Sequence, residues 1–404
     1  MDSITTIEEF YDVMNESVYT RRDIVEALMR DDEPDIEDIK ILKEILESLL
    51  SIPRSDGEWV LKTSDGKSIR MNLDYELREL DRDIRFLING EESLVSEISR
   101  NDNAFLTDVR SVMDYVESSD VDNLITDRDG TINNYCDRYL SAVQSAYNSY
   151  FLCRFLRRRT RNKRKKGIIV TSAPLEGITK LSVDPGNTFI YAGSKGREFL
   201  TSRGSRREKK IDGKKKEKLD EVKTGILDLI KKSKYSKFSL IGSGFQEKFG
   251  QITIARQDIS GSIAKKESED FLKRIKKIVR DADKGEGLLD IEDTGLDIEI
   301  MVTTGSKKGF DKGDGILYIA KELGIDMKRS STLVCGDTSS DLPMAEKISG
   351  KSKSARSIFV TKDKNLKRKV RRKVKNSIFV STPDALVYGL HCAARKNKTK
   401  KNKK

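Results

Sequence analysis

Two acidic motifs are the strongest sign of chemistry in this sequence. The first is Asp127-Arg128-Asp129-Gly130-Thr131, a DxDGT pattern, and the second is Gly336-Asp337-Thr338-Ser339-Ser340-Asp341, a GDxxxD pattern. Either motif alone could be a turn or a helix cap, because aspartate favours both. Here both motifs follow short apolar runs, Thr171 follows a third such run, and Lys312 lies between Thr171 and the second motif. Coincidence is therefore an improbable explanation of the set.

The composition restricts what such a site could do. The chain has a single histidine, His391, which excludes histidine-based triads, His-rich zinc sites and most histidine acid–base mechanisms, so carboxylates must carry any catalysis. Four cysteines lie far apart without a CxxC pair, at Cys136, Cys153, Cys335 and Cys392. Because disulfide frameworks and zinc sites need closer spacing, we expect reduced thiols in a cytoplasmic protein.

Length and apolar pattern indicate a multidomain protein outside the membrane. The 404 residues correspond to about two to four domains at roughly 100–200 residues each. No apolar run approaches the roughly 18 residues that cross a bilayer. The acidic start Met-Asp-Ser also lacks the basic flank and apolar core of a secretory signal. We therefore expect no membrane partner.

The net charge is basic, and the basic residues occur in runs. Lys and Arg number 78 against 66 Asp and Glu, which gives a net charge of +12. The runs lie at residues 157–166, 206–218, 367–375 and 396–404. Such runs suggest nucleic acid, but they are more often solvated surfaces, and no RNA-recognition or zinc-finger pattern accompanies them. We expect nucleic acid not to be a partner, and residues 394–404 to form a disordered basic tail.

Residues 1–118 have the pattern of a small helical domain. Thr6 and Glu9 form a capping-box pattern, and apolar stripes at helical spacing follow, one of them ending at Gly90 as a C-cap. Two apolar stretches, 59–61 and 69–71, flank Asp65-Gly66 and predict a hairpin between the helices. We find no chemistry in this segment and predict a protein-partner or self-association module.

Residues 119–204 and 305–393 alternate short apolar runs with helical stretches, which is typical of an α/β domain. The predicted strands cover residues 123–126, 168–170, 332–335 and 357–360. In open parallel sheets, the loops that leave the carboxyl ends of the strands build the site. The polar residues that follow three of these strands are therefore expected to converge.

Residues 205–304 differ in texture and predict an α+β module inserted between the two halves of the α/β domain. Residues 238–241 and 251–254 resemble an antiparallel pair, a basic amphipathic helix carries Phe271, Ile275 and Ile278 on one face, and a further strand covers residues 296–302. Such an insertion suits a lid, because its closure can exclude water from a reaction.

Together, these motifs resemble the four motifs of the haloacid dehalogenase superfamily of phosphotransferases, over about residues 121–393. The resemblance implies an α/β fold: a Rossmann-like parallel-sheet core with an inserted α+β cap, here preceded by the helical bundle. It also implies Mg²⁺, a hard cation that prefers oxygen ligands. The implied ligands are Asp127, the backbone carbonyl of Asp129, Asp337 and Asp341.

The resemblance also assigns catalytic roles, and the physics accounts for the residue types. A phosphate monoester is anionic, so the implied nucleophile Asp127 can attack only if negative charge is neutralised. Asp129 would protonate the leaving oxygen and then act as base toward water. Thr171 would donate to a phosphate oxygen, and the ammonium of Lys312 would offset the charge of the transferring group.

Further stretches look like the trehalose-6-phosphate phosphatases, in particular the nematode type with an N-terminal helical domain. They include Thr171–Leu175, Gly196-Arg197-Glu198, Gly242–Lys248 and Phe310–Gly315. The likeness implies a small phosphorylated disaccharide as substrate and sugar contacts from Arg197, Glu198, Lys248 and Glu299. The segment after Gly-Arg-Glu is reduced to Phe199-Leu200 and the basic runs are atypical, which leaves the exact sugar open.

Two alternatives stay open at this point. One is a phosphatase of the same superfamily that acts on another sugar phosphate or on a polynucleotide 3′-phosphate; the basic runs favour the polynucleotide, whereas a closing cap suits a small substrate better. The other is a non-catalytic scaffold that uses the helical bundle, although all the carboxylates that catalysis requires are present.

Overall fold

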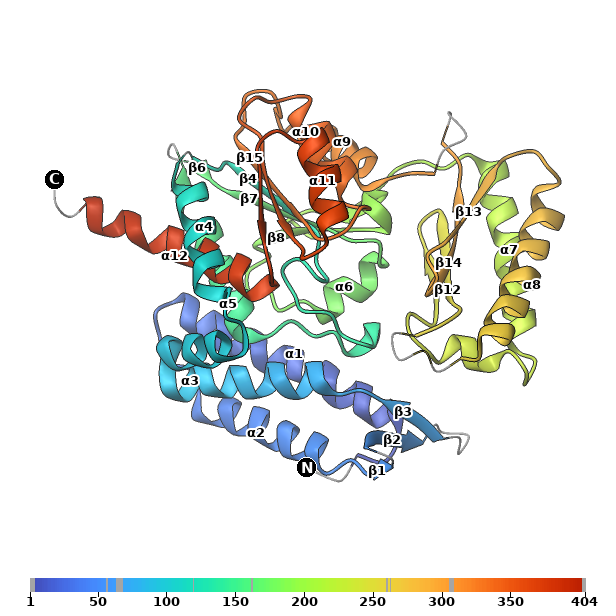
Figure 1. The fold of residues 1–404 in the computed structure, drawn as a ribbon, viewed down its shortest axis with the longest axis horizontal. Helices are drawn as coiled ribbons and strands as arrows, with labels where there is room; N and C mark the ends of the chain where they lie inside the picture. Colours follow the sequence, from blue (N-terminus) through green and yellow to red (C-terminus); the bar gives the residue numbers. More distant parts are fainter. Residues whose placement is uncertain are drawn as a thin grey trace.

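The computed structural model describes residues 4–55, 57–62, 68–118, 120–160, 163–258, 261, 263–304 and 309–401. It has three parts: N-terminal helices, an α/β part with a large sheet, and a smaller α+β part beside it (Figure 1). The α/β fold with an inserted α+β unit and an N-terminal helical bundle is thus confirmed.

The central sheet positions the acidic motifs. Its strand order is β10-β9-β8-β7-β4-β15-β16-β17. In this order, β8, β7, β4, β15, β16 and β17 are parallel to one another. Strands β9 and β10 add an antiparallel edge next to β8. The bounds are β4 (Asn123–Thr126), β7 (Lys166–Val170), β8 (Phe189–Gly193), β9 (Glu198–Leu200), β10 (Arg206–Glu208), β15 (Thr332–Gly336), β16 (Arg356–Val360) and β17 (Ser377–Val380). The four predicted strands are confirmed as β4, β7, β15 and β16, while β8, β9, β10 and β17 join them without having been predicted.

Helices cover both faces of this sheet. Successive strand residues point to opposite faces, so Leu124 packs in one hydrophobic cluster and Ile125 in another. The first cluster lies under α5 (Ala146–Arg157), α6 (Leu175–Leu181) and α12 (Pro383–Lys401). The second lies under α9 (Lys312–Glu322), α10 (Leu342–Ser349) and α11 (Lys364–Lys373). The sheet is therefore buried on both sides, and its strand ends remain for function.

The N-terminal part contains α1 (Ile7–Met29), α2 (Ile36–Leu50), α3 (Asp74–Asn101) and α4 (Phe105–Glu117), with a sheet of β1 (Arg54–Ser55), β2 (Glu58–Lys62) and β3 (Ser68–Met71). The capping box is confirmed, because Thr6 and Glu9 exchange hydrogen bonds at 3.0 and 3.2 Å. The hairpin is confirmed as β2 and β3, although Asp65-Gly66 lies outside the described residues. Gly90 breaks α3 with a φ of +80°, but the helix resumes after it.

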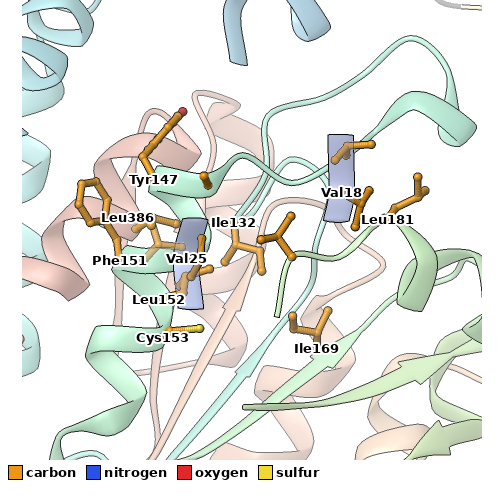
Figure 2. Packing of buried hydrophobic residues seen from close by; sticks show 14 of the residues in the cluster. Val18, Val25, Ile132, Tyr147, Phe151, Leu152, Cys153, Ile169, Leu181 and Leu386 are labelled. Atoms are coloured by element: carbon orange, nitrogen blue, oxygen red, sulfur yellow. The ribbon is translucent and has the colours of Figure 1, made fainter. Parts of the chain in front are cut away.

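These N-terminal helices share one hydrophobic core with the α/β part. Figure 2 shows Val18 and Val25 of α1 among Leu152 and Leu181 of α5 and α6. Helix α4 packs on α12, where the rings of Phe105 and Tyr388 stack at 6.0 Å. A boundary at residue 118 therefore separates segments that fold around the same core.

The inserted part has its own core. Its sheet order is β11-β12-β14-β13, with β11 (Phe245–Lys248), β12 (Gln251–Ala255), β13 (Leu289–Asp293) and β14 (Asp297–Val302). Helices α7 (Gly213–Ile230) and α8 (Lys265–Asp283) cover the side away from the α/β part (Figure 1). We refer to this part as the cap. The predicted strand at residues 238–241 is wrong: residues Ser236–Ser239 form a short 3₁₀ helix, because the ring of Phe238 stacks on Phe271 at 3.8 Å.

Several shorter features complete the fold. Two 3₁₀ turns, η1 (Tyr139–Ser141) and η2 (Ser194–Gly196), and a small hairpin of β5 (Arg159–Thr160) and β6 (Lys163–Arg164) connect the larger elements.

Helix α12 continues through Lys401 where we predicted a disordered tail from residue 394, because no proline or glycine interrupts its final turns. All four cysteines are free, as predicted. Among the described helices, none is both long and apolar enough to span a membrane.

Candidate active site

Three aspartates from the two motifs lie together at the carboxyl ends of the central strands. Asp127 follows β4, and Asp337 and Asp341 follow β15, the parallel neighbour of β4. One carboxylate oxygen from each lies within 4.8 Å of the other two, and all three side chains are buried. Since β4 and β15 pair in register, the residues that follow them leave the sheet at the same edge, as we predicted.

Lys312 bridges two of these carboxylates. Its Nζ donates to Oδ1 of Asp127 and to Oδ1 of Asp341, both at 2.6 Å. Lys312 is the first residue of α9, and a capping box formed by Asp311 and Asp314 fixes that end of the helix. The start of α9 therefore holds the ammonium in the middle of the acidic cluster.

Charge in this cluster is not balanced by the described side chains. Burial raises the pKa of Asp127 to about 7 and that of Asp337 to about 8, and repulsion from nearby carboxylates adds to both shifts. Burial acts on Asp341 too, but Lys312 and backbone N–H donors outweigh it and lower the pKa of Asp341. Burial also disfavours the charged form of Lys312, yet the two bridged carboxylates raise its pKa. One ammonium thus faces three buried carboxylates, an arrangement that a cation would stabilise.

The donor set fits Mg²⁺, because this hard cation prefers carboxylate and carbonyl oxygens. Asp127, Asp337 and Asp341 supply three carboxylates at one place. The side chain of Asp129 does not join them, since its carboxylate binds Arg128 at 2.5 Å. The backbone carbonyl of Asp129 takes no part in that ion pair, and it is the atom that the resemblance implied.

Asp129 and Thr171 line the same cavity as the acidic cluster. The Asp129 side chain is 29 % exposed, more than any of the three clustered aspartates, so water and substrate can reach it. Thr171 follows β7 on the other side of β4, and its Oγ1 accepts a hydrogen bond from Ala173 N at 3.2 Å. The structure brings together all four predicted catalytic side chains.

Two further residues contact the aspartates and were not assigned a role from the sequence. Thr131 Oγ1 donates to Asp337 at 3.2 Å and lies 3.4 Å from Asp127. The Tyr135 hydroxyl donates to Asp337. Gly130 makes this approach possible, because a Cβ at its φ of +81° would lie 2.3 Å from Asp337 and 2.5 Å from the tyrosine ring. The DxDGT motif is a signal for Thr131, whereas only the fold shows that Tyr135 turns back to the site.

The cap closes the opposite side of this cavity of about 340 Å³. Its contribution is mostly polar and consists of Gly242, Ser243, Gln246, Lys248, Thr253, Gln257, Asp258, Leu296, Asp297 and Glu299. Burial lowers the pKa of Lys248 to about 8, against the attraction of Glu299. Burial opposes ionisation of Glu299 as well, but Lys195 and Lys248 lower its pKa overall. A charged donor and a charged acceptor thus face the acidic cluster across the cavity.

Arg197 and Glu198 are not among the residues that line this cavity. Arg197 donates to Val302 O at 2.9 Å and stacks on the Phe310 ring at 4.5 Å. Glu198 accepts from Leu175 N at 3.3 Å and from the guanidinium of Arg206 at 2.7 Å. This geometry does not support their predicted sugar contacts, because Arg197 binds cap strand β14 and Glu198 binds the start of α6 and strand β10.

The arrangement defines the class to which the chain belongs. A parallel sheet with DxDGT after a central strand, GDxxxD after its neighbour and a cap inserted between them is a haloacid dehalogenase-like fold. A family model for the C-terminal part of trehalose-6-phosphate phosphatase matches residues 124–386, and one for the N-terminal helical bundle domain of the same proteins matches residues 6–108. The chain belongs to the trehalose-6-phosphate phosphatase family.

Curated relatives agree with this assignment. The chain is 27 % identical to a trehalose-phosphatase of Caenorhabditis briggsae, over 94 % of this chain and 95 % of that protein. It is 28 % identical to alpha,alpha-trehalose-phosphate synthase (UDP-forming) 2 of Caenorhabditis elegans, over 95 % of this chain and 33 % of that protein. The chain therefore spans about a third of the length of the synthases that it matches.

Two solved structures are similar to this chain at lower identity. The C-terminal domain of C. albicans trehalose-6-phosphate phosphatase aligns over 71 % of this chain and 96 % of that chain, with 14 % identity and a TM-score of 0.49. The Aspergillus fumigatus trehalose-6-phosphate phosphatase aligns over 71 % and 97 %, with 13 % identity and a TM-score of 0.42.

Proposed function

We propose that the chain is a Mg²⁺-dependent phosphatase that hydrolyses trehalose 6-phosphate to trehalose and phosphate through an aspartyl-phosphate intermediate. One observation carries the proposal: a buried acidic cluster bridged by Lys312 faces a polar cap across a single cavity. Membership of the trehalose-6-phosphate phosphatase family supports the choice of substrate.

The first step is attack on phosphorus by the carboxylate of Asp127. A bond forms between a carboxylate oxygen and phosphorus while the bond from phosphorus to the sugar oxygen breaks. Asp129 donates a proton to the leaving sugar oxygen, and such general acid help contributes typically ~10²–10⁴-fold. Its greater exposure suits Asp129 to exchange that proton with the cavity.

The second step releases phosphate. Asp129, now a carboxylate, takes a proton from a water molecule that attacks phosphorus, and the bond to Asp127 breaks. Lys312 and Thr171 stabilise the negative charge of the phosphoryl oxygens, because both lie at the carboxyl edge of the sheet beside Asp127. The nucleophile is regenerated as a carboxylate.

Asp127, Asp337, Asp341 and the backbone carbonyl of Asp129 would hold the Mg²⁺ ion. When bound, Mg²⁺ supplies positive charge that lets an anionic nucleophile approach an anionic phosphate. Lys248 and Glu299 would contact the sugar, since disaccharide hydroxyls need both donors and acceptors.

A substrate panel tests the proposed function. Release of phosphate is measured for trehalose 6-phosphate, other sugar phosphates and a 3′-phosphorylated oligonucleotide, each with Mg²⁺ and with a chelator. We expect a clear preference for trehalose 6-phosphate and loss of turnover with the chelator. A preference for another substrate would refute the proposed substrate, and Mg²⁺-independent turnover would refute the proposed cofactor.

The variant Asp127→Asn tests the nucleophile. We expect turnover to fall by about 10³-fold or more, because the amide cannot form the acyl-phosphate. The fold should persist, since asparagine has nearly the same shape and removes one of three mutually repelling carboxylates. Circular dichroism and thermal unfolding provide the control, and substantial residual turnover would contradict the assignment.

A further inference from the structure

A strained turn lies where the cap meets the sheet. Ser194, Lys195 and Gly196 have consecutive positive φ angles of +52°, +59° and +88°. Left-handed backbone costs a residue other than glycine roughly 1–2 kcal/mol, so two such residues in a row call for an explanation. Backbone strain of this kind persists only where the surrounding structure enforces it, and it concentrates at functional positions.

The turn is fixed to the catalytic part of the molecule on two sides. Lys195 N donates to Thr171 O at 2.9 Å, which ties it to the predicted phosphate-binding loop. A Cβ on Gly315, in the first turn of α9, would lie 2.1 Å from Lys195 O. The turn therefore touches both the loop that carries Thr171 and the helix that carries Lys312.

The same turn holds the cap. The hydroxyl of Ser194 accepts a hydrogen bond from Phe249 N, in the turn between β11 and β12, at 2.9 Å. The Nζ of Lys195 donates to Oε2 of Glu299 on β14 at 2.7 Å, with the lysine 9 % exposed. Glu299 lines the cavity and Lys195 does not, so the lysine lies behind the carboxylate.

Lys195, a cation on the sheet side of the cavity, thus holds Glu299, which belongs to the cap. Lys248 attracts the same carboxylate from β11, which is separated from β14 by β12 in the cap sheet. After Lys195, Lys248 attracts this carboxylate most strongly, so we expect Glu299 to turn toward Lys248 when Lys195 is removed. One cavity donor and one cavity acceptor would then neutralise each other, and fewer polar groups would remain for the sugar.

We infer that Lys195 is a positioning residue for the sugar: it orients Glu299 toward the cavity and fastens the cap to the turn at residues 194–196, which is hydrogen-bonded to the predicted phosphate-binding loop. The inference rests on the proposed function and adds a residue on the sheet side that governs recognition by the cap. Two classes of substrate should therefore respond differently to the loss of Lys195. A phosphorylated disaccharide reaches the cap and depends on Lys195, whereas a small aryl phosphate such as p-nitrophenyl phosphate needs only the acidic cluster.

Lys195→Met tests this separation by steady-state kinetics on both substrates with Mg²⁺ present. Loss of a charged hydrogen bond worth about 1.5–3 kcal/mol predicts a fall of about 10- to 100-fold in kcat/KM for trehalose 6-phosphate. For p-nitrophenyl phosphate we expect less than about a twofold change, because that substrate does not reach the cap. Lys195→Arg keeps the charge and should restore much of the loss.

Lys237→Met is the matched control, because Lys237 pairs with Glu267 at 2.6 Å on the cap but lies outside the cavity. The Lys237→Met substitution should leave kcat/KM unchanged for both substrates. An equal loss on both substrates for Lys195→Met would show a merely structural role, and an unchanged kcat/KM for the disaccharide would refute the inference outright.

Glu299→Gln completes a double-mutant cycle with Lys195→Met. We expect the double variant to lose no more disaccharide activity than the worse single variant, since both remove the same contact; additive losses would contradict the inference. If the unmodified chain hydrolyses p-nitrophenyl phosphate but not trehalose 6-phosphate, the proposed substrate fails. The cycle is then measured with the sugar phosphate that the chain does hydrolyse, and the same two outcomes decide it.

Discussion

At the scale of single residues, the molecule concentrates negative charge where its sheet ends. Asp127, Asp337 and Asp341 are all buried, and Lys312 is the cation that Asp127 and Asp341 share. Such a cluster is unfavourable by itself, because buried like charges repel and lose hydration. The chain nevertheless keeps these three carboxylates together. A divalent cation bound between them would offset their repulsion, which is the physical reason to expect one there.

Mg²⁺ should therefore stabilise the folded chain. An ion that binds only the folded state at a hundred times its Kd adds about 2.7 kcal/mol to the free energy of unfolding. We expect Mg²⁺ to raise the Tm, and Asp337→Asn to abolish that rise without lowering the Tm measured in chelator. Glu208→Gln, on the exposed edge strand β10, is the control and should keep the full rise. An unchanged rise in Asp337→Asn would remove Asp337 from the ligands.

Burial of Glu76 makes the stability of the folded chain depend on pH. Burial raises the pKa of this carboxyl from 4.5 to about 7, against hydrogen bonds from Ser141 and Cys136. Between these two values the folded chain keeps a proton that the unfolded chain releases, so the free energy of unfolding falls as pH rises. The full effect of this group is about 3 kcal/mol.

Urea unfolding at pH 4.5 and pH 7.5 measures this effect. Glu76→Gln cannot ionise, so its loss of stability over that interval should be smaller than that of the unmodified chain by about 3 kcal/mol at most. Glu8→Gln, on the solvent side of α1, serves as the control and should match the unmodified chain. An identical pH dependence in Glu76→Gln would show that Glu76 is already ionised in the folded state.

At the scale of elements, the site depends on how closely α9 approaches the turn at residues 194–196. Gly315 lies in α9 and Gly196 in the turn, and neither has room for a Cβ: one added to Gly315 would lie 2.8 Å from the Cα of Gly196. The absence of two side chains thus lets the helix that carries Lys312 contact the turn that carries Lys195. Two glycines far apart in the sequence thus set the spacing between the helix of Lys312 and the turn of Lys195.

Gly315→Ala should therefore destabilise the protein, although alanine favours a helix over glycine by about 1 kcal/mol. Overpacking against a backbone carbonyl costs about 1–3 kcal/mol and would move Lys312 away from the aspartates, so we also expect weaker activity. Thermal unfolding and phosphate release measure the two effects. Gly213→Ala, at the start of α7 with open space around it, should be neutral or stabilising. A stable and fully active Gly315→Ala variant would contradict the close approach.

At the scale of the whole molecule, the N-terminal helices are part of the catalytic body. Arg82 of α3 pairs with Asp384 of α12 at 3.0 Å, and the Tyr147 hydroxyl of α5 donates to Glu79 at 2.9 Å. Figure 2 shows Val18 and other apolar side chains closing the same core. The cap, in contrast, folds around a separate cluster of its own. The helices that we predicted as a partner module thus bury much of their apolar surface against the rest of the chain.

Removing residues 1–118 should therefore prevent the remainder from folding. The cut exposes the apolar faces of α5 and α12 and leaves Asp384 without Arg82, and an unpaired buried charge costs several kcal/mol. We expect an aggregated or dye-binding product without a cooperative thermal transition. Replacing the cap, residues 210–304, by a short linker that leaves β10 in place is the control and should leave cooperative unfolding intact. A soluble and cooperatively folded product of the first deletion would refute the shared core.

The sequence by itself determined the parts of this protein that depend on local pattern. The strands before Asp127 and Asp337, the capping box at Thr6 and the hairpin of β2 and β3 could all be predicted, because each depends on the order of neighbouring residues. Loops at the carboxyl ends of parallel strands build the site, so the convergence of the acidic residues could be expected, and the pairing of β4 with β15 brings them together.

Only the tertiary structure decided which distant side chains meet. Lys195 and Glu299 are 104 positions apart, and nothing near either residue indicates the other. Arg197 belongs to the Gly196-Arg197-Glu198 stretch, yet its guanidinium binds Val302 O and does not line the cavity. Phe238 lies in a strand-like run, but stacking on Phe271 made it part of a 3₁₀ turn. The reason is physical: local propensity is encoded in neighbouring residues, whereas burial and charge pairing depend on which surfaces the whole chain brings into contact.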